Sequence, residues 1–369
     1  MKKLIVLATL AALPAVALAD VTISGDIGVS IVNYNHKDGD KTSENAMNRQ
    51  TGQIVFSGSE DVGNGLKAIW QVANRIDASG DEKNSWGGRD TFVGLQGEFG
   101  KVRFGKLSNP ANSGYSRQEP FNEISIHGDG VGAVAEQRTA NTIRFDSANY
   151  AGFEFAASAQ LRPESTGHST SAVAYVNDAG TPADTTDDFA DIKLVDAYNA
   201  AAPHVWGAGV KYANGPFSAN YSYTKLVDTE LTLDSDAEAS AVAGSNTRVH
   251  VVSANYAIGD LTLGLGYANA KVTADDGSFG KQAGWGVTAT YALGNLTPKV
   301  SYWKEGKLKT EDGDALGSYN VFSVGADYAL SKRTSAGVEF QFQGARKDYS
   351  DNTKSGKKNT SAVYLTHAF

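Results

Sequence analysis

Hydrophobic residues alternate with small or polar residues along most of this chain. In segment 261–268, for example, the odd positions hold Leu or Tyr, whereas the even positions hold Thr, Gly or Ala. The same alternation recurs in segments 217–224, 285–293 and 322–330. Because successive side chains of a strand point to opposite faces, this pattern predicts β-strands with one apolar face and one small, polar or charged face.

Sixteen segments of the chain have this character. The predicted strands lie at about 20–35, 50–60, 66–76, 89–97, 101–107, 141–147, 153–162, 204–213, 217–227, 247–258, 261–272, 281–293, 296–307, 319–330, 335–346 and 360–369. Short turns such as 214–216 alternate with long connections such as 36–48, 108–140, 163–203 and 228–246. An even number of antiparallel strands with one rim of short turns and one of long loops predicts a closed barrel. Sixteen strands enclose a water-filled lumen, whereas eight would be filled by side chains.

The side of the sheet that carries the apolar residues decides the class of fold. A soluble β-sandwich would also alternate, with its apolar face turned inward. Two features favour a barrel that faces lipid: the other face carries charges that need water, and the apolar rows tend to end on Tyr, Trp or Phe. An outward apolar band edged by aromatic residues is typical of transmembrane barrels. We therefore predict an all-β, sixteen-stranded antiparallel transmembrane β-barrel in a single domain.

The first residues have the features of an export signal. Lys2 and Lys3 precede an apolar run at 4–16, and Ala17-Leu18-Ala19 fits the small-residue pattern of a cleavage site. This order predicts a cleaved secretory signal peptide at 1–19 and a barrel at 20–369. A single spanning helix is the alternative, but the apolar run is short for a span and the cleavage site follows directly.

The composition argues against several other functions. The net charge is −8 at pH 7, which disfavours nucleic acid as a partner. The chain has no Cys, so disulfides, thiolate ligands and thiol catalysis are excluded. The 6 His residues show no metal-ligand spacing, and no Ser/His/Asp or Ser/His/Asn arrangement is present. We therefore expect no enzyme activity, no cofactor and no metal, and we disfavour a barrel-bound hydrolase.

Four segments resemble those of neisserial and other β-proteobacterial general porins. They are 58–71, 92–95, 99–107 and 141–147, which read GSEDVGNGLKAIWQ, FVGL, FGKVRFGKL and NTIRFDS. Phe369 is similar to the terminal assembly signal of that class, so the resemblance implies the outer-membrane assembly machinery as a partner.

The resemblance implies a homotrimer of sixteen-stranded barrels embedded in the lipid of a Gram-negative outer membrane. It also implies passive diffusion of ions and small hydrophilic solutes. In such porins the third long loop, here about 108–140, folds into the barrel and narrows it. Two alternatives remain open: a substrate-specific pore that prefers anions, and a surface adhesin whose barrel is only an anchor.

The alternation of inward and outward positions along each strand, here called its parity, identifies the charged residues that face the lumen. If the apolar residues of each strand face outward, the inward charges are Asp26, Arg75, Lys101, Arg103, Arg144 and Asp146. We expect Arg75, Arg103 and Arg144 to belong to the basic wall of a constriction. Lys106 would break this parity, so its strand is predicted to end or bulge before it.

The resemblance adds further residues to the predicted constriction. It places basic positions of the family at Arg89 and Arg138. It also implies an opposing acidic group on the third loop, formed by Glu119, Glu123 and either Asp129 or Glu136. Two walls of opposite charge would set up a transverse field that favours polar permeants.

Overall fold

A computed structural model of the chain describes most of the predicted barrel. The described residues are 21–36, 43–48, 52–76, 86–115, 120–126, 135–161, 171–177, 189–195, 204–229, 245–274, 277–349, 352 and 354–369. The predicted leader at 1–19 lies outside the described residues, as do Glu119 and Asp129.

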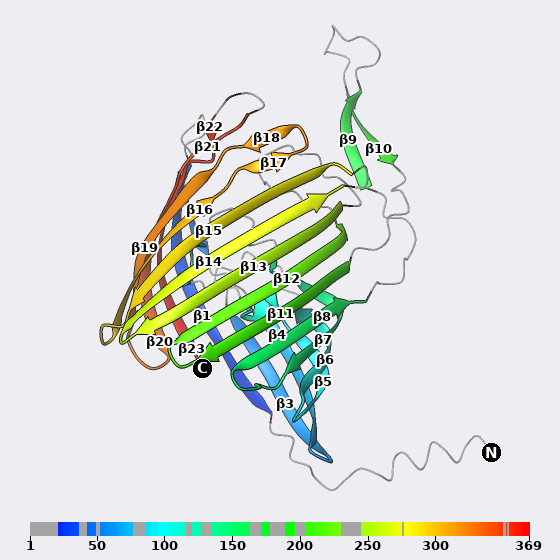
Figure 1. Ribbon diagram of the computed structural model, residues 1–369, viewed down its shortest axis with the longest axis vertical. Coiled ribbons are helices and arrows are strands. Elements are labelled where there is room, and N and C mark those ends of the chain that lie inside the picture. The colour runs from blue at the N-terminus through cyan, green and yellow to red at the C-terminus, as the bar shows by residue number, and fades with distance from the viewer. Residues whose placement is uncertain are drawn as a thin grey trace, which may run out of the picture.

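The strands form one antiparallel sheet that closes on itself (Figure 1). Its closure joins the last barrel strand to the first, in a register that runs from Asp26 opposite Ala368 to His36 opposite Lys358. The sixteen strands of the barrel are β1 (Thr22–His36), β3 (Gln53–Gly63), β4 (Leu66–Arg75), β5 (Thr91–Gly97), β6 (Gly100–Ser108), β7 (Arg138–Ser147), β8 (Phe153–Gln160), β11 (His204–Asn214), β12 (Phe217–Thr229), β13 (Ser245–Ile258), β14 (Leu261–Thr273), β15 (Phe279–Tyr291), β16 (Leu296–Glu305), β19 (Tyr319–Ala329), β20 (Thr334–Gln343) and β23 (Lys358–Ala368).

The sixteen-stranded closed barrel predicted from the sequence is confirmed, with one strand to correct. The predicted long connection 36–48 contains a strand, β2 (Ser43–Asn48), which pairs with the upper half of β1, while β3 pairs with its lower half. The other short elements are β9 (Ser171–Asn177), β10 (Phe189–Val195), β17 (Leu308–Thr310), β18 (Gly313–Leu316), β21 (Arg346–Lys347), β22 (Lys354–Ser355) and the 3-10 helix η1 (Ala111–Ser113).

The predicted parity of the strands is also confirmed. On β14 the odd positions Leu263, Leu265 and Tyr267 are exposed on the outer face, whereas Ala268 and Ala270 are fully buried inside. The strand that contains Lys106 differs in detail from the prediction that it ends or bulges before this residue. A register shift between Gly105 and Leu107 marks a bulge, but β6 continues through it to Ser108.

The two rims of the barrel differ, as the connection lengths indicated. At the lower rim in Figure 1, where the C-terminus lies, the strands are joined by tight turns. Two of these turns begin at Gly259 and Gly294, whose φ angles of 57° and 61° belong to the left-handed region that glycine adopts without strain. The strand ends that the long connections join lie at the other rim, beyond which the β9–β10 hairpin projects (Figure 1).

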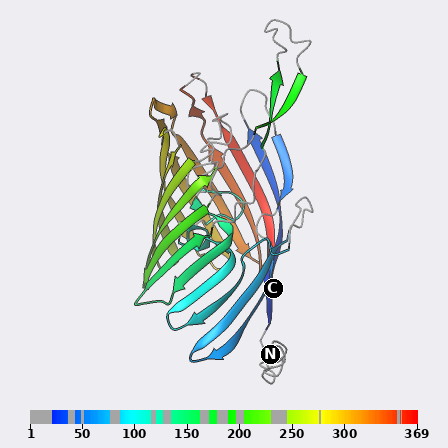
Figure 2. The same cartoon turned by 90° about the vertical axis from the view of Figure 1, so that its right-hand side faces the viewer.

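The barrel wall is not equally high all round. Strands β5 to β8 have 7 to 10 residues, whereas β12 to β15 have 13 or 14. Figure 2 shows the resulting step, with the short cyan strands ending well below the tall green and yellow ones.

An apolar cluster lies inside the barrel. The inner face was expected to be small, polar or charged, yet Val249, Val251, Trp303 and Val321 point inward and are fully buried. They belong to the same cluster as residues of segment 109–137, namely Ala111, Phe121, Ile124, Ile126 and Ala135. Burial against this segment explains why the inner face tolerates large apolar side chains here.

Candidate functional site

Segment 109–137 begins beside a buried cluster of three charges. Asp146 on β7 accepts bonds from the guanidinium groups of both Arg103 on β6 and Arg144, at 2.5 and 2.6 Å. Arg144 also donates from Nη1 to the carbonyl oxygen of Ser108, at 2.7 Å, and to the hydroxyl of Ser113. Since Arg144 is only 2% exposed and Arg103 8%, both side chains are largely withdrawn from water.

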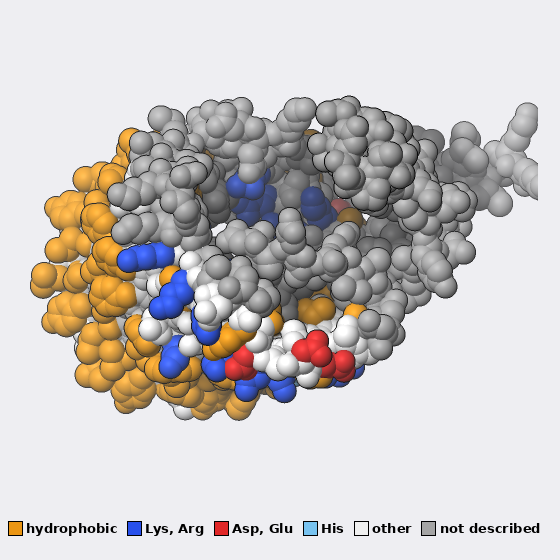
Figure 3. Space-filling view, turned by 90° about the horizontal axis from the view of Figure 1, so that it is seen from above, with side chains coloured by type: hydrophobic (Ala, Val, Ile, Leu, Met, Phe, Trp, Pro, Cys, Tyr) orange, Lys and Arg blue, Asp and Glu red, His pale blue; other side chains and the backbone are white. Residues whose placement is uncertain are grey.

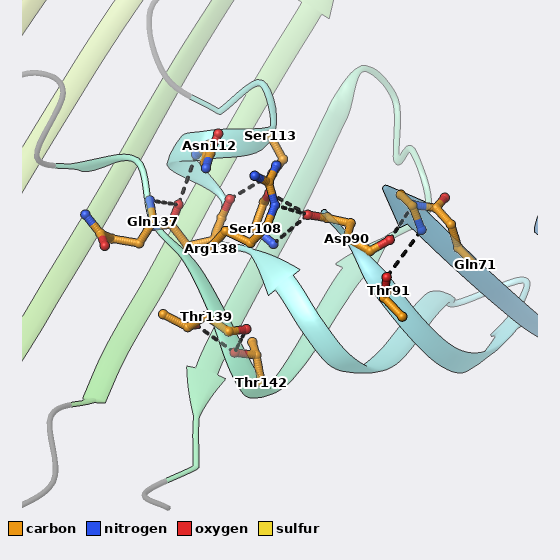
Figure 4. Close-up of polar contacts among 12 residues, drawn as sticks. Gln71, Asp90, Thr91, Ser108, Asn112, Ser113, Gln137, Arg138, Thr139 and Thr142 are labelled. Atoms are coloured by element: carbon orange, nitrogen blue, oxygen red, sulfur yellow. Dashed lines mark hydrogen bonds and ion pairs between the residues drawn. The ribbon is translucent and has the colours of Figure 1, made fainter. Parts of the chain in front are cut away.

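A second acid ties the strand ends together at the same place (Figure 4). One carboxylate oxygen of Asp90 accepts bonds from Arg138 Nε at 2.6 Å and from the Ser108 hydroxyl at 2.7 Å. The Gln71 side chain donates to the Asp90 carbonyl oxygen at 2.8 Å, which links β4 to the residues just before β5. Arg138 keeps about a quarter of its side chain exposed, so it is far more accessible than Arg144.

The two ends of segment 109–137 are joined to each other and to the barrel. The Asn109 side-chain oxygen accepts bonds from the backbone N–H groups of Asn112 and Gln137, at 3.0 and 3.2 Å. Its amide nitrogen donates to the Ala135 carbonyl oxygen and to the Thr224 hydroxyl on β12, at 2.8 and 3.0 Å. These bonds hold the two ends of the segment together against β12.

The middle of the segment contacts strands far from its base. Glu339 on β20 is completely buried, and its carboxylate accepts bonds from the backbone N–H groups of Asn122, Glu123 and Ile124, at 2.7, 2.9 and 3.1 Å. Lys299 on β16 donates to the same carboxylate at 2.7 Å. Its ammonium also bonds both oxygens of Asp327 on β19, at 2.9 and 3.0 Å, and lies 5.2 Å from the centre of the Phe121 ring.

Tyr364 on β23 completes this group of contacts. Its hydroxyl donates to Asp327 and accepts a bond from the Asn122 side-chain amide. Gln341 on β20 donates to the Ser125 carbonyl oxygen. Residues 121–125 therefore bond to side chains of β19, β20 and β23, and Phe121 lies against the ammonium group of Lys299 on β16.

Three arginines gather near the base of the segment. Arg89, which precedes β5, lies close enough to Arg75 and Arg138 for their charges to act on it, together with Asp26 and Asp90. Burial, followed by the repulsion of Arg138 and Arg75, lowers the pKa of Arg89 from its ordinary value. The arrangement concentrates positive charge on one part of the inner surface.

A cavity of about 610 Å³ lies within the barrel beside this segment. Gly114 and Pro120 of the segment contribute to its lining, and the barrel contributes hydroxyl, amide and charged groups: Glu154, Lys211, Ser218, Asn220, Asn255, Thr262, Thr288, Thr290, Thr297, Lys299 and Asp327. The Lys211 ammonium lies 4.3 Å from the ring centre of Tyr115. Burial, with the nearby negative charges of Asp146 and Glu154, raises the pKa of the Tyr115 hydroxyl to about 12, so it stays neutral at physiological pH.

The structure brings together most of the predicted inward charges. Arg103, Arg144 and Asp146 form one cluster, and Asp26, Arg75, Arg89 and Arg138 form another. Glu123 contacts Glu339 through its backbone N–H.

Four residues of the site were missed by the sequence reasoning: Asp90, Lys299, Asp327 and Glu339. Parity could have identified Glu339, because Val338 and Phe340 on either side of it face outward.

Replacing Asp146 with Asn is expected to lower the free energy of unfolding by about 3–5 kcal/mol, because two buried guanidinium groups would lose their shared carboxylate. Urea titration of the folded barrel, followed by tryptophan fluorescence, would measure the change. Asp314→Asn is the matched control, since Asp314 pairs with Lys307 on the exposed surface and should have no measurable effect. Equal unfolding curves for the two variants would contradict the role assigned to Asp146.

Within the described ranges, no helix has the length and hydropathy needed to cross a membrane. The described residues also contain no group of three or more His, Asp or Glu residues placed to hold a metal ion.

Comparison with known proteins gives consistent matches. A family model described as Gram-negative porin matches residues 6–348. The chain is 32% identical over 354 residues to the major outer membrane protein P.IB of Neisseria meningitidis serogroup B, and the match covers 91% of each chain. Among solved structures, an anion-selective porin from Comamonas acidovorans is similar, with a TM-score of 0.67, 20% identity, and coverage of 95% of this chain and 100% of that chain. The trimer form of OmpT from Vibrio cholerae has a TM-score of 0.67 and 14% identity, and the match covers 95% of this chain and 99% of that one.

Proposed function

Because this chain belongs to the Gram-negative porin family, we propose that it forms a water-filled channel through which ions and small hydrophilic solutes diffuse passively. The protein lies in the outer membrane and crosses it with the sixteen strands of its barrel. The observation that carries the proposal is a closed barrel with an apolar outer face and a hydrogen-bonded segment that reaches opposite parts of its inner surface. A segment that crosses the lumen narrows the channel, and a narrow channel selects solutes by size and charge without any catalytic group.

Segment 109–137 is the inward-folded loop of this channel. The bonds from its base to β7 and β12, and from residues 122–124 to Glu339 on β20, support this assignment. The constriction then lies between the loop and the arginine-rich part of the inner surface. Its basic side comprises Arg75, Arg89 and Arg138, and its acidic side comprises Glu119, Glu123 and Asp129 of the loop.

Arg103 and Arg144 have a different part in the proposed constriction. Their burial and their shared bonds to Asp146 favour a role in holding the base of the loop. An ion in the channel would meet the more accessible Arg138 first.

The functional unit is a homotrimer embedded in outer-membrane lipid. The trimeric form of the similar OmpT barrel supports this assembly. The leader at 1–19 directs export, and the assembly machinery recognises Phe369. The backbone N–H and carbonyl of Phe369 bond to those of Gly25 on β1, at 2.9 and 3.1 Å, so this residue takes part in closing the barrel.

Purified protein added to a planar lipid bilayer is expected to produce stepwise increases in current, because each inserted barrel opens a continuous aqueous path. The closed sixteen-stranded sheet is the reason for this expectation. Protein unfolded before addition is the control and should give no steps. Folded protein that inserts but carries no current at any voltage would contradict the proposal.

An anion-preferring channel is the second candidate function. The mutual proximity of Arg75, Arg89 and Arg138 favours it, because a basic cluster at a narrowing repels cations. The similar barrel from Comamonas acidovorans is described as anion-selective. Reversal potentials in a salt gradient would distinguish this candidate from a channel without ion preference.

A further inference from the structure

Four basic residues stand side by side at the upper ends of four long neighbouring strands, β12 to β15. In the strand register Lys225 on β12 pairs with Arg248 on β13, Arg248 pairs with Lys271 on β14, and Lys271 pairs with Lys281 on β15. We call these four residues the outer basic row. Arg248, Lys271 and Lys281 are exposed, and Lys225 is half-buried.

The outer basic row lies on the outer face of the barrel, above its apolar band. Four residues further down each strand, on the same face, an exposed apolar or aromatic side chain occurs. These side chains are Tyr221 on β12, Val252 on β13, Tyr267 on β14 and Trp285 on β15. At about 3.3 Å per residue, the row lies roughly 13 Å along the strands from these side chains. Aromatic residues border the apolar band of a membrane barrel, so the row reaches the headgroup region.

Within the described residues, no acidic side chain offsets the repulsion between the positive charges of the outer basic row. Directly opposed side chains on neighbouring strands have Cβ atoms about 5 Å apart, and like charges in such pairs are destabilising. None of the four residues forms an ion pair with a described acidic residue. The ammonium groups of Lys271 and Lys281 instead lie 4.6 and 5.6 Å from the centre of one aromatic ring, that of Phe279.

Basic residues inside the barrel, in contrast, have acidic partners. Arg103 and Arg144 share the carboxylate of Asp146, and Lys299 bonds both Asp327 and Glu339. Figure 3, a view from above, shows Lys and Arg side chains along the part of the rim where the hydrophobic outer surface ends. Positive charge without a described counter-charge therefore occurs at a boundary between apolar surface and water.

We propose that the outer basic row binds the phosphate groups of anionic lipids in the outer leaflet. A phosphate placed above the row would screen two or more of its charges at once, and the acyl chains would lie against the apolar band below. Charge complementarity and the position directly above that band favour a lipid over a soluble anion. The proposal requires the barrel to lie in the outer membrane but does not depend on its permeability.

The test compares lipid binding by two triple variants of the folded full barrel in detergent. The row variant is Arg248→Gln, Lys271→Gln, Lys281→Gln. The control variant is Lys67→Gln, Lys332→Gln, Arg333→Gln, which removes the same residue types from exposed positions at the opposite rim. Native mass spectrometry would measure binding of diphosphoryl lipid A, with phosphatidylcholine and inorganic pyrophosphate as comparison probes.

The row variant is expected to bind diphosphoryl lipid A roughly a hundredfold more weakly, because each Lys or Arg near an anionic lipid contributes about fivefold. The control variant should bind as the natural protein does, and both variants should keep its single-channel conductance, which shows that they are folded. A loss smaller than about tenfold in the row variant would overturn the proposal, given that per-residue contribution. So would an equal loss in the control variant, or binding of pyrophosphate as tight as that of the lipid.

Discussion

Replacing Glu339 with Ala is expected to raise the single-channel conductance and the current noise. The carboxylate of Glu339 holds three consecutive backbone N–H groups of the loop, at residues 122–124. Without this acceptor the middle of the loop would no longer be fixed to β20, and the narrowest part of the channel would widen and fluctuate. We expect roughly a twofold higher conductance, since the current follows the width of the constriction. Planar-bilayer recording of single channels would measure the change.

Two matched variants separate this effect from a general loss of structure. Glu339→Gln keeps one acceptor oxygen in the same place, so its conductance should lie between those of the natural protein and the Ala variant. Asp314→Asn removes a carboxylate from an exposed pair with Lys307 that, within the described residues, has no bond to the loop, and should leave the conductance unchanged. Natural conductance and noise in a correctly folded Glu339→Ala barrel would show that Glu339 does not restrain the loop.

Replacing both Arg75 and Arg89 with Ser is expected to shift ion preference strongly toward cations. These two residues belong to the arginine group on the inner surface, and Arg138 is left unchanged because it bonds Asp90 at the base of the loop. A unit positive charge about 5 Å from a permeating ion in water contributes about 0.8 kcal/mol, favourable for an anion and unfavourable for a cation, so each loss should change the anion-to-cation permeability ratio roughly sixteenfold. Reversal potentials in a salt gradient would measure this ratio.

The charge-conserving variant is the control for this prediction. Replacing Arg75 and Arg89 with Lys keeps both positive charges and should leave the permeability ratio close to its natural value. The shift in the Ser variant should also shrink at high ionic strength, because salt screens the fixed charges. An unchanged reversal potential in the Ser variant would remove these two arginines from the constriction.

The sequence was sufficient to predict the strands and the direction of their faces. Alternation in segments such as 261–268 reflects a local rule, because neighbouring side chains of any extended strand point to opposite sides. That rule correctly placed Arg144 and Asp146 inside the barrel, with Phe145 between them exposed on the outer face. Parity cannot tell a dry inner surface from a wet one, so the buried positions of Val249 and Trp303 were not foreseen.

The partners of the inward charges could not be predicted in this way. Asp146 and Arg144 are two residues apart on one strand, yet the base of the loop is bonded through Arg144 to Ser108, which is 36 residues away. Glu339 and Asn122 are separated by 217 residues. No periodicity relates such positions, because a loop can contact any strand that the closed barrel brings near it.

Side-chain alternation and turn residues, which act between close neighbours in the chain, specify sixteen antiparallel strands with an apolar outer face. Closure of the sheet and the path of segment 109–137 decide the rest: which arginines are neutralised by Asp146, which gather around Arg89, and where Glu339 holds the loop. Strand direction follows from local geometry, whereas the charge of a channel depends on which groups meet across its lumen, and only the folded barrel brings those groups together.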